Sequence, residues 1–214
     1  MKTEKIVIVA GGSVDSMLLG SFIEENMYII GADKGLESLE KLGIKPDYAL
    51  GDFDSANEEI RLKYMNSKQT MVLNPMKDYT DTHVALMHAL SRKPETIYIF
   101  GATGSRFDHM MGNLQLLYLA RLNNVEAYII DTNNRICIIN TECFISKEKQ
   151  YGKYVSVMPF SHKVTGINMK GFVYELEDAV ISQGETIGIS NEIREEEGHI
   201  SVGEGYLIVM ETKD

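Results

Sequence analysis

The sequence predicts an α/β protein in which an N-terminal parallel-sheet α/β domain is followed by a C-terminal antiparallel β-sandwich domain. Three observations predict this fold. Up to about residue 132, apolar runs that suit buried strands alternate with segments of helical periodicity. Beyond that point the apolar segments become short, often β-branched and separated by glycines. A chain of 214 residues is also long enough for two domains, each with a core of its own.

The first part of the chain repeats a strand–helix pattern. We expect strands over residues 6–10, 28–32, 48–52, 70–73, 96–100 and 125–130. We expect helices over residues 15–26, 36–42, 58–65, 80–90 and 110–121. This repetition predicts a parallel sheet with helices on both faces, in which ligands bind beyond the carboxyl ends of the strands.

The second part predicts only strands. They are expected over residues 135–140, 154–160, 164–169, 172–176, 186–189, 199–202 and 207–211, with glycines between them. Short strands punctuated in this way are typical of an antiparallel sandwich or barrel. The change in periodicity places the domain boundary between 1–132 and 133–214.

Composition excludes several classes of partner. The net charge of −10 and a pI near 5.0, with no basic run, argue against nucleic acid as a partner. No apolar stretch reaches the roughly 18 residues needed to span a bilayer, and the N-terminus has no signal-peptide pattern. Cys137 and Cys143 lie outside any CxxC motif and are expected to be thiols. These features predict a cytoplasmic protein that does not bind membranes.

Two carboxylates lie two residues apart in segment 51–55 (Gly-Asp-Phe-Asp-Ser), where an apolar run ends. In extended chain, Asp52 and Asp54 share one face. Carboxylates held this close repel unless a cation lies between them, and their hard oxygens suit Mg²⁺. The alternative is an ordinary turn in which Asp54 caps the following helix.

A second acidic pair occurs in segment 77–81 (Lys-Asp-Tyr-Thr-Asp), where a helix is expected to begin. Thr80 is a plausible N-cap, and Asp81 suits the positive end of the helix dipole. That reading explains Asp81 well but leaves Asp78 without a role. Lys77 beside these acids is a cation that can meet a phosphate at a helix start.

Segment 101–109 is a glycine-containing loop between an expected strand and an expected helix. Its backbone amides can approach a phosphate, and Arg106 offers a planar cation to phosphate oxygens. Asp108 can cap the helix or accept a hydrogen bond from a substrate, and Asn113 lies one turn further on. His109 is more often a first-turn residue than a catalyst. The loop has neither the Walker spacing nor GxGxxG.

The acidic segments and the glycine loop fall at the ends of separate predicted strands. Asp33, Asp52, Asp54 and segment 101–108 therefore converge on one edge of the sheet. Carboxylates and a phosphate-binding arginine at one edge predict an enzyme of phosphoryl transfer.

The ordered motifs resemble those of the thiamine pyrophosphokinase family. They are Gly-Ala-Asp33, the acidic segment 51–55, Lys77-Asp78-x-Thr80-Asp81 and Gly-Ser-Arg106-Phe-Asp108-His109 with Asn113. The resemblance continues through Val-Ser-Val-Met-Pro at 155–159 and Ile-Ser-Asn-Glu at 189–192, so it spans nearly the whole chain. Lys34, His83 and Ser105 depart from the family's usual residues.

The resemblance implies transfer of a diphosphate from ATP to the hydroxyl of thiamine, giving thiamine diphosphate and AMP, with Mg²⁺ as cofactor. It also implies a homodimer with thiamine bound between subunits. Residues 1–132 would bind ATP and Mg²⁺, and residues 133–214 would bind thiamine and form the dimer.

The resemblance also assigns residues to these roles. Metal ligands would be Asp52, Asp54 and Asp81. Catalytic residues would be Asp54, Asp81 and Arg106. The ATP site would comprise Lys77, Asp78, Thr80, Arg106, Asp108, His109 and Asn113. The thiamine site would comprise Asp33, Asp54, Ser190 and Asn191. Either Asp54 or Asp81 can accept the hydroxyl proton, and the sequence does not choose between them.

Two other functions use the same features. A metal-dependent phosphohydrolase would use these carboxylates with water as the nucleophile. A non-catalytic sensor would bind nucleotide or thiamine without turnover. The phosphohydrolase would need no acceptor site. The sensor would be expected to have lost at least one of the metal-binding carboxylates.

Overall fold

The chain folds into two units, Met1–Thr132 and Asn133–Asp214, in a computed structural model that describes residues 4–52, 58–65, 67, 69–74 and 78–214. Among these described residues, no helix is both long enough and apolar enough to cross a membrane.

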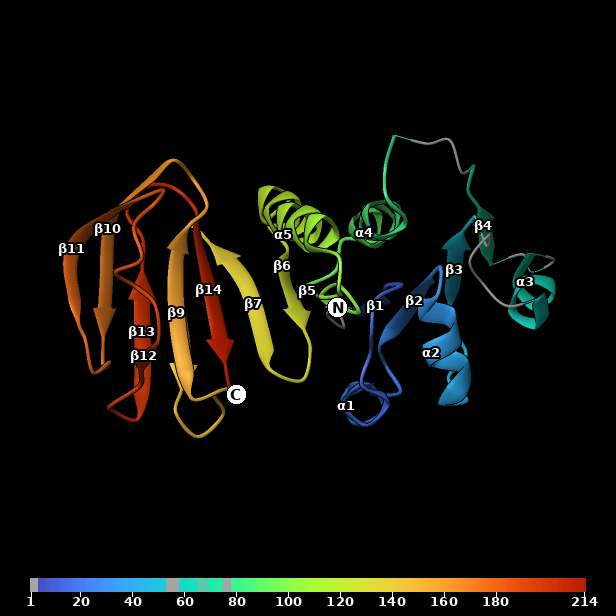
Figure 1. The fold of residues 1–214 in the computed structure, drawn as a ribbon, viewed down its shortest axis with the longest axis horizontal. Helices are drawn as coiled ribbons and strands as arrows, with labels where there is room; N and C mark the ends of the chain where they lie inside the picture. The colour runs from blue at the N-terminus through green and yellow to red at the C-terminus, as the bar shows by residue number, and fades with distance from the viewer. Residues whose placement is uncertain (1–3, 53–57, 66, 68, 75–77) are drawn as a thin grey trace. The chain divides into compact units, whose positions relative to one another are not determined.

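Apolar runs build the parallel sheet of the first unit (Figure 1). Its strands are β1 (Lys5–Val9), β2 (Tyr28–Ala32), β3 (Tyr48–Gly51), β4 (Thr70–Val72), β5 (Thr96–Phe100) and β6 (Glu126–Ile130). Every strand pairing described in this unit is parallel, and the strand order is β6-β5-β1-β2-β3-β4. Residues 6–9 of β1 are fully buried, as expected of a central strand covered on both faces.

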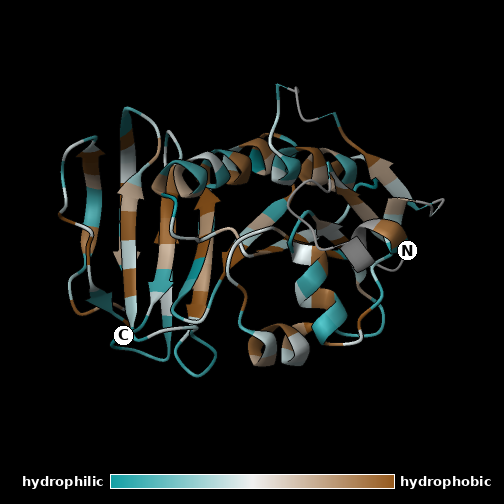
Figure 2. Ribbon diagram, turned by 45° about the vertical axis from the view of Figure 1, so that its right-hand side comes forward, coloured by the Kyte–Doolittle hydropathy of each residue, from teal (hydrophilic) through white to brown (hydrophobic). Residues whose placement is uncertain are grey.

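Helices cover both faces of this sheet. They are α1 (Ser16–Phe22), α2 (Gly35–Lys41), α3 (Glu58–Met65), α4 (Asp81–Ser91) and α5 (Phe107–Leu122). Helices α4 and α5 lie on one face, and α1 and α2 lie on the other (Figure 1). Figure 2 shows hydrophobic colouring along the strands and mixed colouring along the helices, because each helix buries one side only. The predicted parallel α/β architecture is confirmed.

The second unit is antiparallel. Its strands are β7 (Asn134–Ile139), β8 (Glu142–Ser146), β9 (Tyr154–Pro159), β10 (Lys163–Lys170), β11 (Leu176–Ser182), β12 (Asn191–Glu192), β13 (Glu197–Ser201) and β14 (Leu207–Thr212). They run in the orders β12-β9-β14-β7 and β11-β10-β13-β8. Buried side chains from both layers, including Val157, Met169, Phe172 and Leu207, share one core. The predicted sandwich is confirmed.

Two predicted strands of this unit are wrong. Residues 172–175 contain only an isolated bridge from Phe172 to Ile193, Leu176 already belongs to β11, and residues 186–189 lie in a turn region without strand. The sequence reading also missed β8 and β11, which lie at the two edges of their layer. Edge strands carry charged residues that blunt further pairing, and β11 contains Glu177 and Asp178. Alternation of apolar and polar residues therefore does not identify β8 and β11 as strands.

A histidine on α4 packs against the amino-terminal ends of two strands. The ring of His88 stacks on Tyr48, with centroids 3.8 Å apart and planes 7° apart. Its Nε2 lies 3.3 Å from the Tyr28 hydroxyl, and Arg92, which pairs with Glu4 at 2.6 Å, lies over the Tyr28 ring. Burial, and secondarily the positive charge of Arg92, lowers the pKa of His88 below 6.5.

This depressed pKa predicts a pH dependence of stability. The unfolded chain takes up a proton on His88 near pH 6.5, whereas the folded chain does so only at lower pH, so the free energy of unfolding falls as pH decreases through that window. His88→Phe, which keeps the stacked ring, should make this fall smaller. Urea unfolding from about pH 7 to about pH 5 measures it. His162→Gln, at an exposed position, is the control, and parallel pH profiles for wild type and His88→Phe would contradict the account.

The sandwich core predicts a second stability effect. Phe172 is 0% exposed, so Phe172→Ala should lower the free energy of unfolding by about 3–5 kcal/mol through lost burial and a residual cavity. Phe144→Ala removes the same atoms at a position that is 55% exposed and should cost far less. Denaturant unfolding compares the two variants, and equal losses would show that Phe172 is not a core anchor.

Candidate active site

The loops after β1 and β5 touch at the point where the strand order reverses. The chain runs from β1 to β2 on one side and returns to β5 on the other side of β1. The backbone N–H of Gly12 donates to the carbonyl of Gly101 at 3.0 Å. A Cβ on Gly12 would lie 2.3 Å from that carbonyl, and Gly101 has a φ of +68°, so both positions require glycine. Ligands of doubly wound sheets bind in the crevice at such a point.

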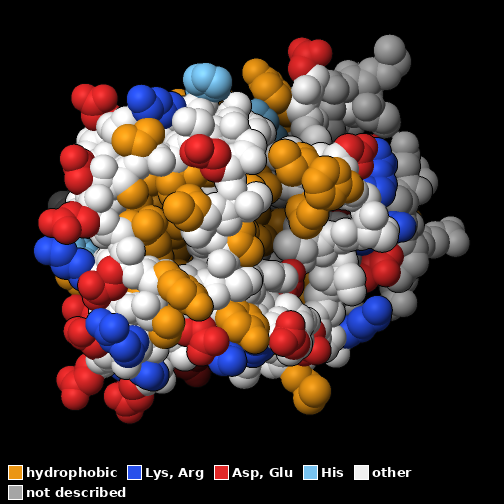
Figure 3. All heavy atoms as spheres, turned by 60° about the vertical axis from the view of Figure 1, so that its left-hand side comes forward, with side chains coloured by type: hydrophobic (Ala, Val, Ile, Leu, Met, Phe, Trp, Pro, Cys, Tyr) orange, Lys and Arg blue, Asp and Glu red, His pale blue; other side chains and the backbone are white. Residues whose placement is uncertain are grey.

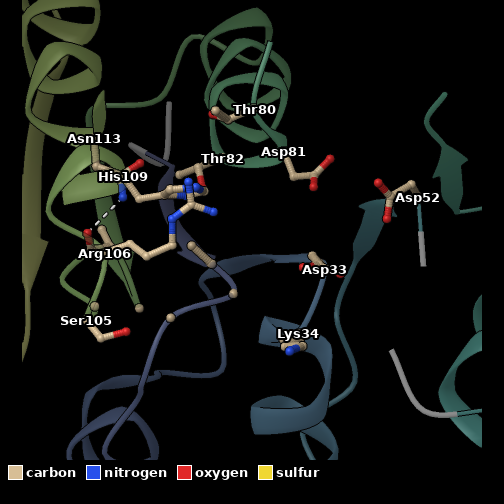
Figure 4. Close-up of a pocket in the computed structure, with 16 residues that line it drawn as sticks. Asp33, Lys34, Asp52, Thr80, Asp81, Thr82, Ser105, Arg106, His109 and Asn113 are labelled. Atoms are coloured by element: carbon tan, nitrogen blue, oxygen red, sulfur yellow. Dashed lines mark hydrogen bonds between the residues drawn. The ribbon is translucent and has the colours of Figure 1, made fainter. Parts of the chain in front are cut away.

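A cavity of about 500 Å³ opens at this edge of the sheet. Side chains that the sequence predicted as functional and that line it are Asp33, Asp52, Thr80, Asp81, Arg106, His109 and Asn113 (Figure 4). They come from the loops after β2, β3 and β5 and from the starts of α4 and α5. Because the loop after β5 runs directly into α5, the first unit brings together these side chains from four separate segments of the sequence.

Three carboxylates reach the cavity from separate elements. Asp33 follows β2, with φ +49° and a backbone N–H that donates to Leu50 at 2.9 Å. Asp52 follows β3, and Asp81 opens α4 next to Thr80, whose hydroxyl accepts from the His83 N–H at 3.2 Å. Thr80 is thus the predicted N-cap. In Figure 4 the carboxylates of Asp52 and Asp81 point toward one another across the cavity.

The donor atoms around this cavity suit a hard cation, because carboxylate oxygens are the ligands that Mg²⁺ prefers. Within the described ranges, no three His, Cys, Asp or Glu side chains come close enough together to hold a metal ion. The predicted ligand Asp54 and the predicted phosphate-binding Lys77 lie outside the described residues. The described part of the expected metal set is therefore Asp52 and Asp81, which face the same space.

Arg106 is the main cation of the glycine loop. It stands just before α5, and its Nε and Nη2 donate to Asp108 at 3.2 and 2.6 Å. The hydrogen bonds from Arg106, together with that from the His109 backbone, hold the pKa of Asp108 below its usual range. Both side chains are exposed, 68% for Arg106 and 65% for Asp108, so a phosphate can reach the guanidinium. In Figure 4 that group points into the cavity.

A second hollow, of about 640 Å³, adjoins the first between α4 and α5. Thr80, His109 and Asn113 line both hollows. Asp78 and Asp108 line only the second, so they lie beside the carboxylate cavity rather than within it.

The side chain of Asn113 makes a hydrogen bond within the protein. It is 8% exposed, and its Nδ2 donates to the carbonyl of Ala102 at 2.8 Å. The side chain that the sequence assigned to ATP therefore supports the glycine loop from α5.

Two predicted thiamine-site residues belong to the second unit. Ser190 has φ +57°, and its N–H donates to the Ser156 hydroxyl at 2.9 Å. Asn191 is 5% exposed; its Oδ1 accepts from the Tyr174 N–H and its Nδ2 donates to the Tyr174 carbonyl. The amide of Asn191 thus fixes the backbone next to Ser190.

Sequence reasoning missed several residues that line the cavity. Lys34 adds a cation beside Asp33, and Thr82 and Ser105 add hydroxyls. Lys34 directly follows a predicted strand end, and that position is the signal in the sequence that could have identified it as a site residue. Gly11 and Gly12 directly follow the first predicted strand, but their spacing does not match a phosphate-binding loop motif.

Comparisons with known proteins agree with this geometry. The family model "Thiamin pyrophosphokinase, catalytic domain" matches residues 19–129, which include the lining residues of the cavity from Asp33 to Asn113. The family model "Thiamin pyrophosphokinase, vitamin B1 binding domain" matches residues 142–207.

Individual relatives match along the whole chain. A thiamine pyrophosphokinase of Bacillus subtilis (strain 168) is 37% identical over 216 residues, covering 100% of both chains. A crystal structure of thiamine pyrophosphokinase from Bacillus subtilis superimposes with a TM-score of 0.89 over 98% of this chain and 99% of that one. A crystal structure from Geobacillus thermodenitrificans, 32% identical, gives 0.86 over 98% of each chain. The chain belongs to the thiamine pyrophosphokinase family of enzymes.

Proposed function

We propose that the protein transfers the β,γ-diphosphate of ATP to the hydroxyl of thiamine, giving thiamine diphosphate and AMP. The observation that supports this most directly is the cavity of the first unit, where Asp33, Asp52 and Asp81 face the same space as Arg106. A site with acids and one arginine at a sheet edge suits a reaction that depends on positioning and charge neutralisation.

In this proposal the thiamine hydroxyl attacks the β-phosphorus, and the bond from that phosphorus to the oxygen bridging to the α-phosphate breaks. The hydroxyl proton goes to a carboxylate, either Asp54 or Asp81. AMP leaves with the electron pair of the broken bond. The guanidinium of Arg106 binds the negatively charged phosphate oxygens. The backbone of the loops near Gly12 and Gly101 lies next to the phosphate chain.

Mg²⁺ is the cofactor that we propose for this site. Asp52, Asp54 and Asp81 would hold it. When bound, it would supply positive charge that offsets the charge of the phosphate oxygens and of the carboxylates themselves. Lys77, Asp78, Thr80, Asp108, His109 and Asn113 complete the proposed ATP site, with Thr80 and Asn113 acting through the backbone that they cap and support.

The proposals for the thiamine site and for a homodimer rest on family membership. We propose that Asp33 and Asp54, with Ser190 and Asn191, bind thiamine between the subunits of a cytoplasmic homodimer. Acidic side chains suit the cationic thiazolium ring. Exposed apolar side chains of the second unit, among them Tyr174, Ile187 and Ile189, support an interaction surface there, and Figure 3 shows hydrophobic side chains gathered on the face that it displays.

One assay tests the function. The purified protein is incubated with ATP, thiamine and Mg²⁺, and the products are separated. Thiamine diphosphate with an equal amount of AMP is expected. Free phosphate or ADP without thiamine diphosphate would indicate a metal-dependent phosphohydrolase. Binding of either ligand without turnover would indicate a sensor.

Asp52→Asn tests the carboxylates. The change keeps the size of the side chain but removes its charge, so the fold should survive while turnover falls by a factor of about 10² or more. Steady-state kinetics over a Mg²⁺ titration measures the loss. Glu25→Gln makes the same chemical change at an exposed position outside the cavity and should leave turnover unchanged. Near-normal turnover in Asp52→Asn would remove Asp52 from the site.

A further inference from the structure

The glycine loop between β5 and α5 is tied to three different elements through three successive residues. The Gly101 carbonyl accepts from the Gly12 backbone after β1 at 3.0 Å. The Ala102 carbonyl accepts from the Asn113 side chain on α5 at 2.8 Å. The Thr103 hydroxyl donates to the Asp131 carboxylate after β6 at 2.5 Å. Arg106 follows three residues later, so these three bonds fix the start of the segment that carries it.

The bond from Thr103 to Asp131 differs from the other two because both partners are side chains. Strands β5 and β6 pair in register up to Phe100 and Ile130, and Asp131 is the next residue after that last pair. Its carboxylate is therefore placed beside the loop by the sheet itself. A hydroxyl that donates to a carboxylate forms a shorter and stronger bond than one between neutral groups.

Neither partner reaches the cavity directly. Gly101, Ala102, Gly104, Ser105 and Arg106 line it, whereas Thr103 and Asp131 are not among the described residues that do so. Their influence on a ligand must therefore pass through the loop. The guanidinium of Arg106 is exposed, so packing does little to fix its position; its hydrogen bonds to Asp108 and the path of the loop backbone do so instead.

We propose that Thr103 and Asp131 are positioning residues that hold the loop so that Arg106 meets the phosphate chain of ATP. This inference rests on the proposed function. Without the bond, the loop remains attached at Gly101 and Ala102 but loses its last anchor before Arg106. ATP then binds less tightly, because part of the interaction with Arg106 offsets the ordering of the loop. Binding of thiamine is not affected by this route.

The test compares variants of the full-length protein. Thr103→Val keeps the shape of the side chain and removes the hydroxyl, and it should raise the ATP Kd, measured by titration calorimetry, by about tenfold. Thr103→Ser keeps a hydroxyl and should restore most of the affinity. Asp131→Asn keeps an acceptor without the charge and should give an intermediate loss. In steady-state assays the KM for ATP should rise, while the KM for thiamine stays within about twofold of wild type.

A matched control separates positioning from loss of stability. Tyr64→Phe removes another hydroxyl–carboxylate bond of 2.5 Å, to Glu40, between α3 and α2. It should lower stability without changing the Kd or the KM for ATP. If Thr103→Val does not fold, Asp131→Asn and Thr103→Ser carry the comparison.

Coupling to Arg106 decides the outcome. On an Arg106→Ala background, Thr103→Val should weaken ATP binding by less than about twofold further, because the group it positions is already gone. Full additivity of the two changes, equal rises in both KM values, or unchanged ATP affinity in Thr103→Val would each overturn the proposal. Absence of thiamine diphosphate from the wild-type assay would instead overturn the proposed function, and the ATP titration would still judge the positioning role.

Discussion

The close approach of two backbone loops, after β1 and after β5, is the constraint on which the candidate site depends. The N–H of Gly12 and the carbonyl of Gly101 meet there because neither residue has a side chain to separate them. Gly12 and Gly101 both line the cavity, so this contact fixes the position of one of its edges. The carboxylates after β2 and β3 and at the start of α4 then face it from the other side.

Charge is divided unevenly around the cavity. The acids Asp33, Asp52 and Asp81 stand on the side of β2, β3 and α4, where Lys34 is the one cation among the described lining residues, whereas Arg106 stands on the side of β5 and α5. In a protein with a net charge of −10, such local separation lets an anion bind on one side while a cation is held on the other. A polyphosphate, a divalent metal and a cationic acceptor are a combination that this arrangement suits.

The sequence predicted the parallel sheet well, because its buried strands are continuous apolar runs and, except at strand 70–73, a glycine or an acid marks the end of each run. It also predicted which acids share an edge, since every parallel strand ends on the same side. It missed Lys34, although that residue lies directly after a predicted strand and Asp33. It also missed Asp131, whose contact with Thr103 depends on the pairing of β5 with β6. It did not predict the bond from the Asn113 amide to the Ala102 carbonyl, because a partner eleven residues away cannot be read from the residue type. The predicted part of Asn113 in the ATP site stays a prediction.

The same limit explains the errors in the second unit. β11 is an edge strand with charged residues, and Phe172 is a buried core residue outside any regular strand. Apolar residues indicate the hydrophobic core. They do not show whether a buried residue lies in a β-strand or in a loop that packs over the sheet. Conversely, charged residues at an edge obscure a strand such as β11, which pairs with β10 on its inner side only.

The bidentate contact between Arg106 and Asp108 has a consequence for how firmly anions are retained. Because the guanidinium already has a carboxylate neighbour, an arriving phosphate exchanges one ionic partner for another instead of capturing an isolated charge. The net gain from that exchange is modest at an exposed position. In the proposed function, Asp108 would therefore compete with the phosphate for Arg106 and limit the net gain from that ion pair.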